Sequence, residues 1–159
     1  MAIGTGLCEY FARWGQPTDA ADLILSRTSQ YAIQAMIYLA GKPGLPILNQ
    51  EIAVRLDLPG SYLSKILTDL ANARLIESFR GRLGGFCLRP EGLNTTLMDI
   101  LLLTEGPMFT KNCLLGLKEC SNETACPLHF RLSANKHELM ELFEQTTLAQ
   151  LAQTVKFGG

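Results

Sequence analysis

Apolar residues recur at helical spacing between residues 26 and 41, where they predict a first helix. Ser26 precedes the pattern as a candidate N-cap, and Gly41 stands where a terminating glycine is expected. Four apolar residues fall at positions i, i+3, i+4 and i+7 and so share one face: Ile33, Met36, Ile37 and Ala40.

Two further helical stretches follow and are joined by a tight turn. After a loop at residues 42–46, a short helix is expected to begin near Asn49, with Ile52, Ala53 and Leu56 facing inward. Residues 57–60 make the turn, and Ser61 is expected to cap a third helix that ends near Ala73. The buried face of that helix consists of Leu63, Ile66, Leu67 and Leu70. Two short helices connected in this way are typical of a helix-turn-helix.

The pattern then changes from helical spacing to alternation. Residues 75–79 predict a strand, residues 80–85 a glycine-rich turn, and residues 86–88 a returning strand. A β-hairpin directly after a helix-turn-helix is a wing. The turn lies between strands and lacks the Gly-Lys-Ser/Thr ending, which disfavours a nucleotide-phosphate loop.

Beyond the hairpin the pattern is helical again. Thr96 is expected to cap a helix over residues 97–103, and a loop follows at residues 108–125. A long helix then has one apolar face, Thr146 and Thr147 break it, and a terminal turn contains Leu148 and Leu151. The apolar face of the long helix is formed by Leu128, Leu132, Leu139, Leu142 and Phe143.

These elements predict a mostly α fold with a small β-wing, in which a winged helix-turn-helix is followed by a long C-terminal dimerisation helix. The expected divisions are a leader at residues 1–22, a DNA-binding domain at 23–92, and a part at 93–159 with a helix, a cysteine loop and the dimerisation helix. A two-fold dimer suits DNA with palindromic half-sites. Packing of the long helix on its own domain is the alternative.

The exposed face of the third helix carries hydrogen-bonding side chains suited to base edges and phosphates, and the candidates are Ser61, Tyr62, Ser64 and Lys65. A generic helical hairpin with a solvated face would look similar. The wing favours the DNA-binding interpretation, because Arg80 and Arg82 lie among three glycines that let the backbone approach DNA closely. Arginines in that setting suit phosphates and narrow minor grooves.

Charge supports the same division of the chain. Residues 23–89 contain eight Lys/Arg and four Asp/Glu, a net of +4, although the whole chain has a net charge of −1. A basic excess confined to one segment is the pattern expected of a phosphate-contacting module. The sequence has no apolar run long enough for a membrane span and no secretory leader, so a cytoplasmic location is expected. It has no arrangement of residues typical of an enzyme.

Three of the five cysteines, Cys113, Cys120 and Cys126, fall within fourteen residues, and His129 follows. Clustered thiolates in a reducing compartment favour iron–sulfur clusters, zinc or copper(I). The gaps are wider than those of ordinary zinc knuckles and suit a larger cluster, with His129 as a candidate fourth ligand. Zinc, a reversible disulfide and metal-free thiols remain as alternatives. Cys87 is expected to be a packed wing residue.

Taken together, these residues resemble the IscR, NsrR and RirA family of bacterial regulators from about Leu25 to Leu151. The likeness is carried by the opening helix at 26–39, by Ser61-Tyr62-Leu63, by the wing at 80–86 and by the cysteine loop ending in residues 126–129. It implies a homodimer that binds palindromic promoter DNA, usually as a repressor, and holds a [2Fe–2S] or [4Fe–4S] cluster. The implied signals are iron or cluster supply, nitric oxide and redox state.

The chain departs from the family pattern in three places. Gln30 stands where some members supply a carboxylate ligand from the partner subunit, and the six-residue gap after Cys113 is one longer than in the IscR type. The leader is extra. The resemblance therefore favours His129 as the fourth ligand over a ligand from the first helix.

Overall fold

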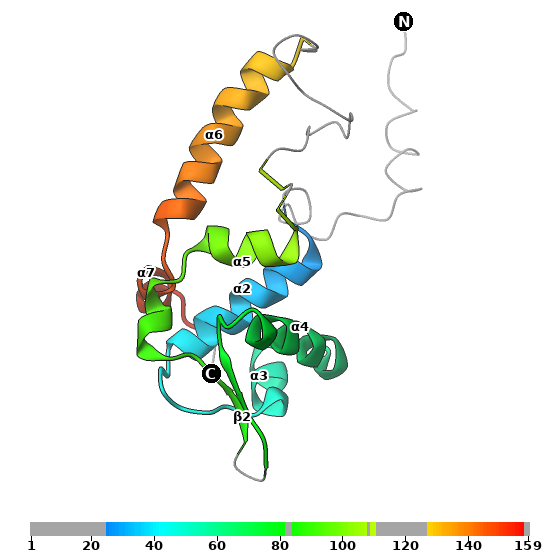
Figure 1. Cartoon of the computed structure of the whole chain (residues 1–159), viewed down its shortest axis with the longest axis vertical. Helices are drawn as coiled ribbons and strands as arrows, with labels where there is room; N and C mark the ends of the chain where they lie inside the picture. Colours follow the sequence, from blue (N-terminus) through cyan, green and yellow to red (C-terminus); the bar gives the residue numbers. More distant parts are fainter. Residues whose placement is uncertain (1–24, 82–83, 108, 111–126, 158–159) are drawn as a thin grey trace, which may run out of the picture.

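The computed structural model describes residues 25–157 apart from residues 82–83, 108 and 111–126. Its elements follow the predicted order of three helices, a hairpin and two further helices, but the predicted terminal turn is a third helix and a short 3-10 turn follows the hairpin. They are α2 (Arg27–Ala40), α3 (Asn49–Leu56), α4 (Gly60–Asn72), β1 (Glu77–Phe79), β2 (Gly85–Cys87), η2 (Pro90–Asn94), α5 (Leu97–Thr104), α6 (His129–Gln145) and α7 (Leu148–Thr154). The predicted mostly helical winged fold is confirmed (Figure 1).

Helix α2 is central, and α4, α5 and α7 all pack against it. Its predicted inward face is buried at Met36, Ile37 and Ala40, while Ile33 is partly covered. Ser26 caps this helix by accepting a hydrogen bond from the Ser29 amide. The main core also contains Ile100 of α5 and Leu148 of α7. Apolar burial therefore joins residues on both sides of the predicted boundary at 92/93, which itself stays a prediction.

The turn between α3 and α4 differs from the prediction in one detail. Asp57 adopts a left-handed conformation that ends α3, with φ 53°. The Pro59 carbonyl accepts a hydrogen bond from the Leu63 amide at 2.9 Å, so Gly60 is the first helical residue of α4. The expectation that Ser61 caps this helix was wrong, because Ser61 already lies inside the first turn. The four predicted inward leucine and isoleucine side chains are buried.

The wing is a hairpin closed by a third, short pairing. Strands β1 and β2 are antiparallel, with Phe79 opposite Gly85, and Ile47 forms a bridge to Phe86 on the other side of β2. Gly85 has φ 142°, and a Cβ atom there would lie 2.4 Å from the Ile47 carbonyl oxygen. Only glycine fits this position, since any side chain would collide with backbone. The base of the wing is thus pinned to the loop before α3.

Helices α5 and α7 begin side by side. Thr96 and Thr147 each form a capping box, with Asp99 and Gln150 as the respective partners. The two starts are joined because the Leu97 amide donates to Thr146 and the Leu148 amide donates to the Thr95 carbonyl. The predicted cap at Thr96 and the predicted break at residues 146–147 are both confirmed.

Helix α6 extends from this junction as a long arm (Figure 1). Phe143 is buried against Met98 and Leu101 of α5, and Leu139 packs partly on the same cluster. Leu142, predicted on the same apolar face, is instead 57% exposed. The helix thus uses one part of its apolar surface on its own chain and leaves another part uncovered.

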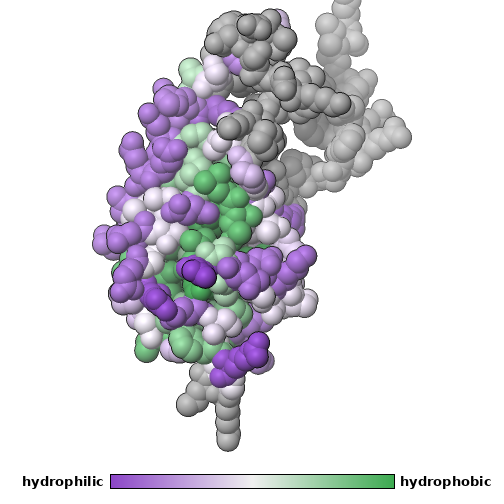
Figure 2. Space-filling view, in the orientation of Figure 1, coloured by the Kyte–Doolittle hydropathy of each residue, from purple (hydrophilic) through white to green (hydrophobic). Residues whose placement is uncertain are grey.

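Further apolar surface is exposed on α5, where Leu102 and Leu103 are 38% and 37% exposed. In the space-filling view of Figure 2, apolar residues gather near the middle of the visible face, at the level of α5, with polar residues around them. Within the ranges that the structure describes, no helix is long and apolar enough to cross a membrane.

Candidate nucleic-acid interface and cysteine loop

The candidate base-reading residues lie in the first turn and a half of α4. Ser61 and Lys65 are exposed, Tyr62 is 39% exposed, and Ser64 is partly covered. Because Leu63, Ile66 and Leu67 face the core, these four side chains occupy the outer side of the helix. A helix held by its apolar side, with its polar N-terminal turn outward, has the placement that a recognition helix requires.

Tyr62 has contacts within the chain that the sequence did not predict. Its hydroxyl is hydrogen-bonded to the hydroxyl of Thr28, and its ring packs edge-on against Tyr31 with centroids 5.9 Å apart. Both partners belong to α2. Tyr62 therefore connects the start of α4 to the first turns of the central helix, besides offering an exposed edge outward.

The wing places Arg80 at its exposed tip, and Gly81 beside it has φ 102°. Arg82 lies outside the described residues. At the base, the Arg89 guanidinium forms an ion pair with Glu77, and that hydrogen bond holds the pKa of Glu77 below its usual value. Arg89 is thus partnered within the hairpin.

Three of the four predicted metal ligands, Cys113, Cys120 and Cys126, lie outside the described residues. His129 is the first residue of α6 and is partly exposed. No three His, Cys, Asp or Glu side chains gather as a metal site among the residues for which the structure gives positions.

Two further residues of metal-ligating type, Cys87 and His137, lie in the described part of the chain outside the predicted ligand set. Cys87 is 3% exposed in β2, and burial raises the pKa of its thiol, as expected of a packed thiol. His137 is exposed on α6 and lies 3.3 Å from the Glu141 carboxylate. The structure thus agrees with packing for Cys87 and with a solvated position for His137.

A partly buried polar cluster at the end of α5 was missed by the sequence reasoning. The Glu105 carboxylate accepts hydrogen bonds from the Ser26 amide at 2.9 Å and from the hydroxyl of Ser29, which is fully buried. Ser29 also pairs with the Thr104 hydroxyl at 2.6 Å. Burial acts to raise the pKa of Glu105, but the Ser29 and Ser26 hydrogen bonds outweigh it and lower the pKa. These contacts join residues nearly 80 positions apart, so no local pattern announces them.

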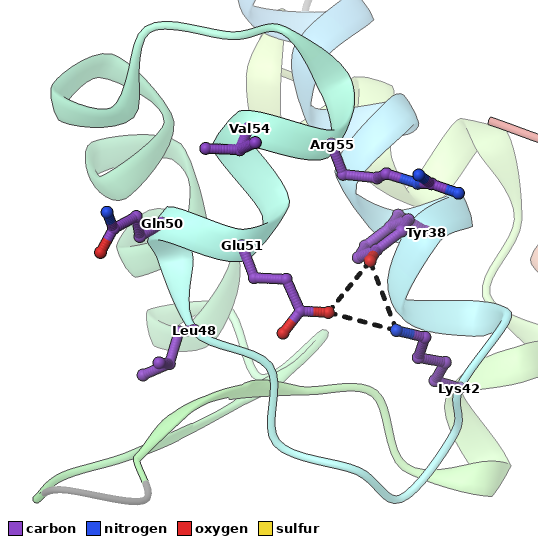
Figure 3. Close-up of a pocket in the computed structure, with 7 residues that line it drawn as sticks. All are labelled: Tyr38, Lys42, Leu48, Gln50, Glu51, Val54 and Arg55. Carbon is purple, nitrogen blue, oxygen red and sulfur yellow. Dashed lines mark hydrogen bonds and ion pairs between the residues drawn. The ribbon is translucent and has the colours of Figure 1, made fainter. Parts of the chain in front are cut away.

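A pocket beside α3 has the character of a structural junction. Figure 3 shows the Tyr38 hydroxyl and the Lys42 ammonium both directed at the Glu51 carboxylate, at 3.1 and 3.2 Å. These hydrogen bonds lower the pKa of Glu51, and the one from Lys42 has the larger effect. Arg55 on the rim donates to the Phe157 carbonyl at 3.5 Å. The Lys42 ammonium and the Glu51 carboxylate are directed at one another, and this pair connects α3 to the end of α2.

The order α2–α3–α4 followed by a pinned hairpin defines a winged helix-turn-helix, the architecture of many DNA-binding regulators. Residues 25–154 match the family model described as Rrf2, an iron-dependent transcriptional regulator. This chain belongs to the Rrf2 family of DNA-binding transcriptional regulators. Its relatives are regulators and not enzymes, as expected from the sequence.

Individual relatives agree with this assignment. The chain is 32% identical over 129 residues to the regulator CymR of Bacillus subtilis (strain 168), covering 80% of this chain and 88% of CymR. It is 30% identical over 131 residues to a protein of Aquifex aeolicus (strain VF5) whose name gives it as a regulator of the helix-turn-helix type, covering 81% and 91%.

Solved structures show the same fold. CymR, described as the global cysteine regulator of B. subtilis, superposes with a TM-score of 0.69 at 28% identity, covering 83% of this chain and 98% of CymR. IscR of T. potens superposes with a TM-score of 0.64 at 27% identity, covering 88% and 97%. The winged-helix assignment and the resemblance to the IscR group are thereby confirmed.

Proposed function

We propose that this chain is a homodimeric repressor that binds palindromic promoter DNA with an affinity controlled by an iron–sulfur cluster. The cluster, [2Fe–2S] or [4Fe–4S], would be held by Cys113, Cys120, Cys126 and His129. The observation that carries the proposal is the donor set itself: three thiols in fourteen residues, followed by an imidazole at the start of α6. The iron dependence in the family description supports it.

The donor chemistry fits such a group. Thiolates are the ligands that iron–sulfur clusters prefer, and an imidazole replaces a thiolate in some of them. His129 begins α6 directly after Pro127 and Leu128, three positions after Cys126. When bound, a cluster would supply a centre that responds to iron or cluster supply, nitric oxide or redox state. The division between a DNA-binding domain at residues 23–92 and a cluster-binding and dimerisation part at residues 93–159 is also part of this proposal.

The DNA-contacting residues proposed are Ser61, Tyr62, Ser64 and Lys65 of α4, with Arg80 and Arg82 of the wing. The four helix residues are suited to base edges and to neighbouring phosphates, and the two arginines to phosphates and the minor groove. The exposure of Ser61, Lys65 and Arg80 supports this assignment. With DNA as its partner, the protein would work in the cytoplasm.

The uncovered apolar surface supports a dimer. Leu142 of α6 and Leu102 and Leu103 of α5 remain exposed although helices α5 and α6 pack together. Burying such residues against a second copy is favourable, and a two-fold interface would bury each of them twice. The same symmetry would place two recognition helices on a palindrome.

A second function, direct sensing through thiols, is favoured by particular neighbours. CymR of B. subtilis is described as a cysteine regulator, and a Staphylococcus aureus CymR structure in an oxidized form superposes with a TM-score of 0.63 at 31% identity. In that case the cysteine trio would form a reversible disulfide. A zinc-stabilised regulator is the third arrangement that the same donors allow.

Purification without oxygen separates these functions. We expect brown protein with visible charge-transfer absorption and with iron and acid-labile sulfide in matching amounts, because thiolate-bound iron absorbs visible light. Metal analysis by mass spectrometry provides the count. Colourless protein containing zinc would support the zinc arrangement, and colourless metal-free protein whose thiols oxidise reversibly would support thiol sensing.

Removing Arg80 and Arg82 together should weaken DNA binding and flatten its salt dependence. Each phosphate contact contributes about 0.9 to the slope of log K against log salt, so the double alanine variant should lose about 1.8. Fluorescence anisotropy measured between roughly 50 and 200 mM salt gives the slope. Lys156→Ala, at the exposed C-terminal end, is the control for simple loss of charge. An unchanged slope would remove the wing from the interface.

A further inference from the structure

The first turn of α2 is held from two sides by residues of other helices. On one side, Glu105 at the end of α5 accepts hydrogen bonds from the Ser26 amide and the Ser29 hydroxyl. Helix α2 has no acidic residue of its own in this turn. A carboxylate at a helix N-terminus is favourable, and Glu105 supplies it from outside the helix.

On the other side, the same turn holds the start of the recognition helix. The Thr28 hydroxyl is hydrogen-bonded to the Tyr62 hydroxyl, and Tyr31 packs edge-on against the Tyr62 ring. Tyr62 lies in the first turn of α4, where no side chain caps the helix. Its bond to Thr28 and ring contact with Tyr31 are therefore a fixed attachment of that otherwise uncapped turn.

We propose that Glu105 and Thr28 are positioning residues for DNA reading: through the first turn of α2 they fix the orientation of the N-terminal turn of α4. Tyr62 then acts on specificity through Thr28 as well as through its own exposed edge. Neither Glu105 nor Thr28 needs to touch DNA.

This arrangement gives the cysteine loop a route to the DNA-binding face. Glu105 lies eight residues before Cys113 and one residue after the end of α5. A structural change that displaces the segment after Glu105 would weaken the hydrogen bonds of Glu105 to Ser26 and Ser29. The first turn of α2 would then be held less firmly, and the contact between Thr28 and Tyr62 would weaken with it. This last step rests on the proposed function, whereas the positioning itself does not.

The positioning is tested first without DNA. Hydrogen–deuterium exchange on the full chain compares wild type, Glu105→Ala and Thr28→Val at the amides of residues 60–65. We expect faster exchange there in both variants, at least about threefold, since each loses hydrogen bonds that hold the attachment. Glu105→Gln keeps an acceptor oxygen and should restore most of the protection. Unchanged exchange at residues 60–65 in Glu105→Ala would overturn the proposal.

Binding is then measured to a duplex selected by the wild-type protein from random-sequence DNA, with an unselected duplex for non-specific binding. Thr28→Val and Tyr62→Phe should each weaken specific binding about fivefold, and the double variant should be no weaker than either alone. Glu105→Ala should weaken specific binding to the same extent. Combining it with Tyr62→Phe should weaken specific binding no further than either substitution alone. Non-specific binding should stay unchanged. Thr154→Val and Glu91→Ala are matched controls away from this path, expected to bind as wild type.

The possible failures are distinct. Weakening by Tyr62→Phe alone, with Thr28→Val at wild-type affinity, would mean that Tyr62 acts only by touching DNA. The positioning role would also be overturned if the losses of affinity multiplied in the double variants, or if specific and non-specific binding weakened equally. Wild-type protein that selects no sequence, with the exchange results as expected, would refute the proposed function and leave the positioning supported.

Discussion

Replacing any one of Cys113, Cys120 and Cys126 by alanine is expected to change the DNA affinity of anaerobically purified protein by at least about tenfold. A tenfold change corresponds to about 1.4 kcal/mol of coupling between the two sites, which lies within the usual range of allosteric coupling. Each variant should lose its colour and its iron and should bind DNA as metal-depleted wild type does. Visible absorption, iron content and anisotropy on the selected duplex are measured on the same preparations.

Cys87→Ala is the matched control for that series. Cys87 is 3% exposed and packs in the wing strand, so its loss should leave iron content and colour unchanged. His129→Ala tests the fourth position and should retain the thiols but lower the iron content. Three cysteine variants that bind DNA exactly as loaded wild type does would exclude regulation through the loop.

The structural reason for expecting coupling lies at the two described ends of the loop. The cysteine loop follows α5 and Glu105, whose carboxylate is hydrogen-bonded to the first turn of α2, and it leads into α6 at His129. Helix α6 in turn packs on α5 through Phe143. If the proposed regulation holds, a change in the cysteine loop would therefore act on elements that contact the DNA-binding part and the proposed dimer face.

Patterns that act over a few residues predicted most of the fold. The inward residues of α4, the Thr96 cap and the break after α6 depend on spacings of three or four residues, which a sequence displays directly. The glycine-rich turn predicted the wing for the same reason. The start of α4 was predicted too late, with Ser61 as its cap, because the extended backbone of Pro59 already begins the helix at Gly60.

Contacts between distant residues were the part that sequence could not supply. Nothing near Glu105 in the sequence indicates that its carboxylate lies against Ser26, and nothing near Tyr62 indicates Thr28. Tyr62 was predicted to face DNA from its place in the helix. That role stays a prediction, while its attachment to α2 depends on the angle at which two helices cross. Of the predicted ligand set, only His129 falls in the described part of the chain.

Leu142→Glu is expected to convert the dimer to a monomer and to lower affinity for the selected palindrome at least a hundredfold. Fully burying a leucine contributes about 1.5–3 kcal/mol, and Leu142, 57% exposed, has about half of that still to gain. A two-fold interface doubles the loss, and each buried carboxylate adds a desolvation cost of several kcal/mol. Loss of the linked second half-site then removes about 10²-fold or more in avidity.

Sedimentation equilibrium gives the assembly state, with Leu45→Glu as the matched control. Leu45 is 59% exposed, close to the value for Leu142, but it lies in the loop between α2 and α3. It should remain a dimer, because a carboxylate placed there is solvated in both states. A Leu142→Glu protein that is still dimeric would move the interface away from α6. The long arm of α6 would then serve only to cover α5, and its exposed leucine would need another partner.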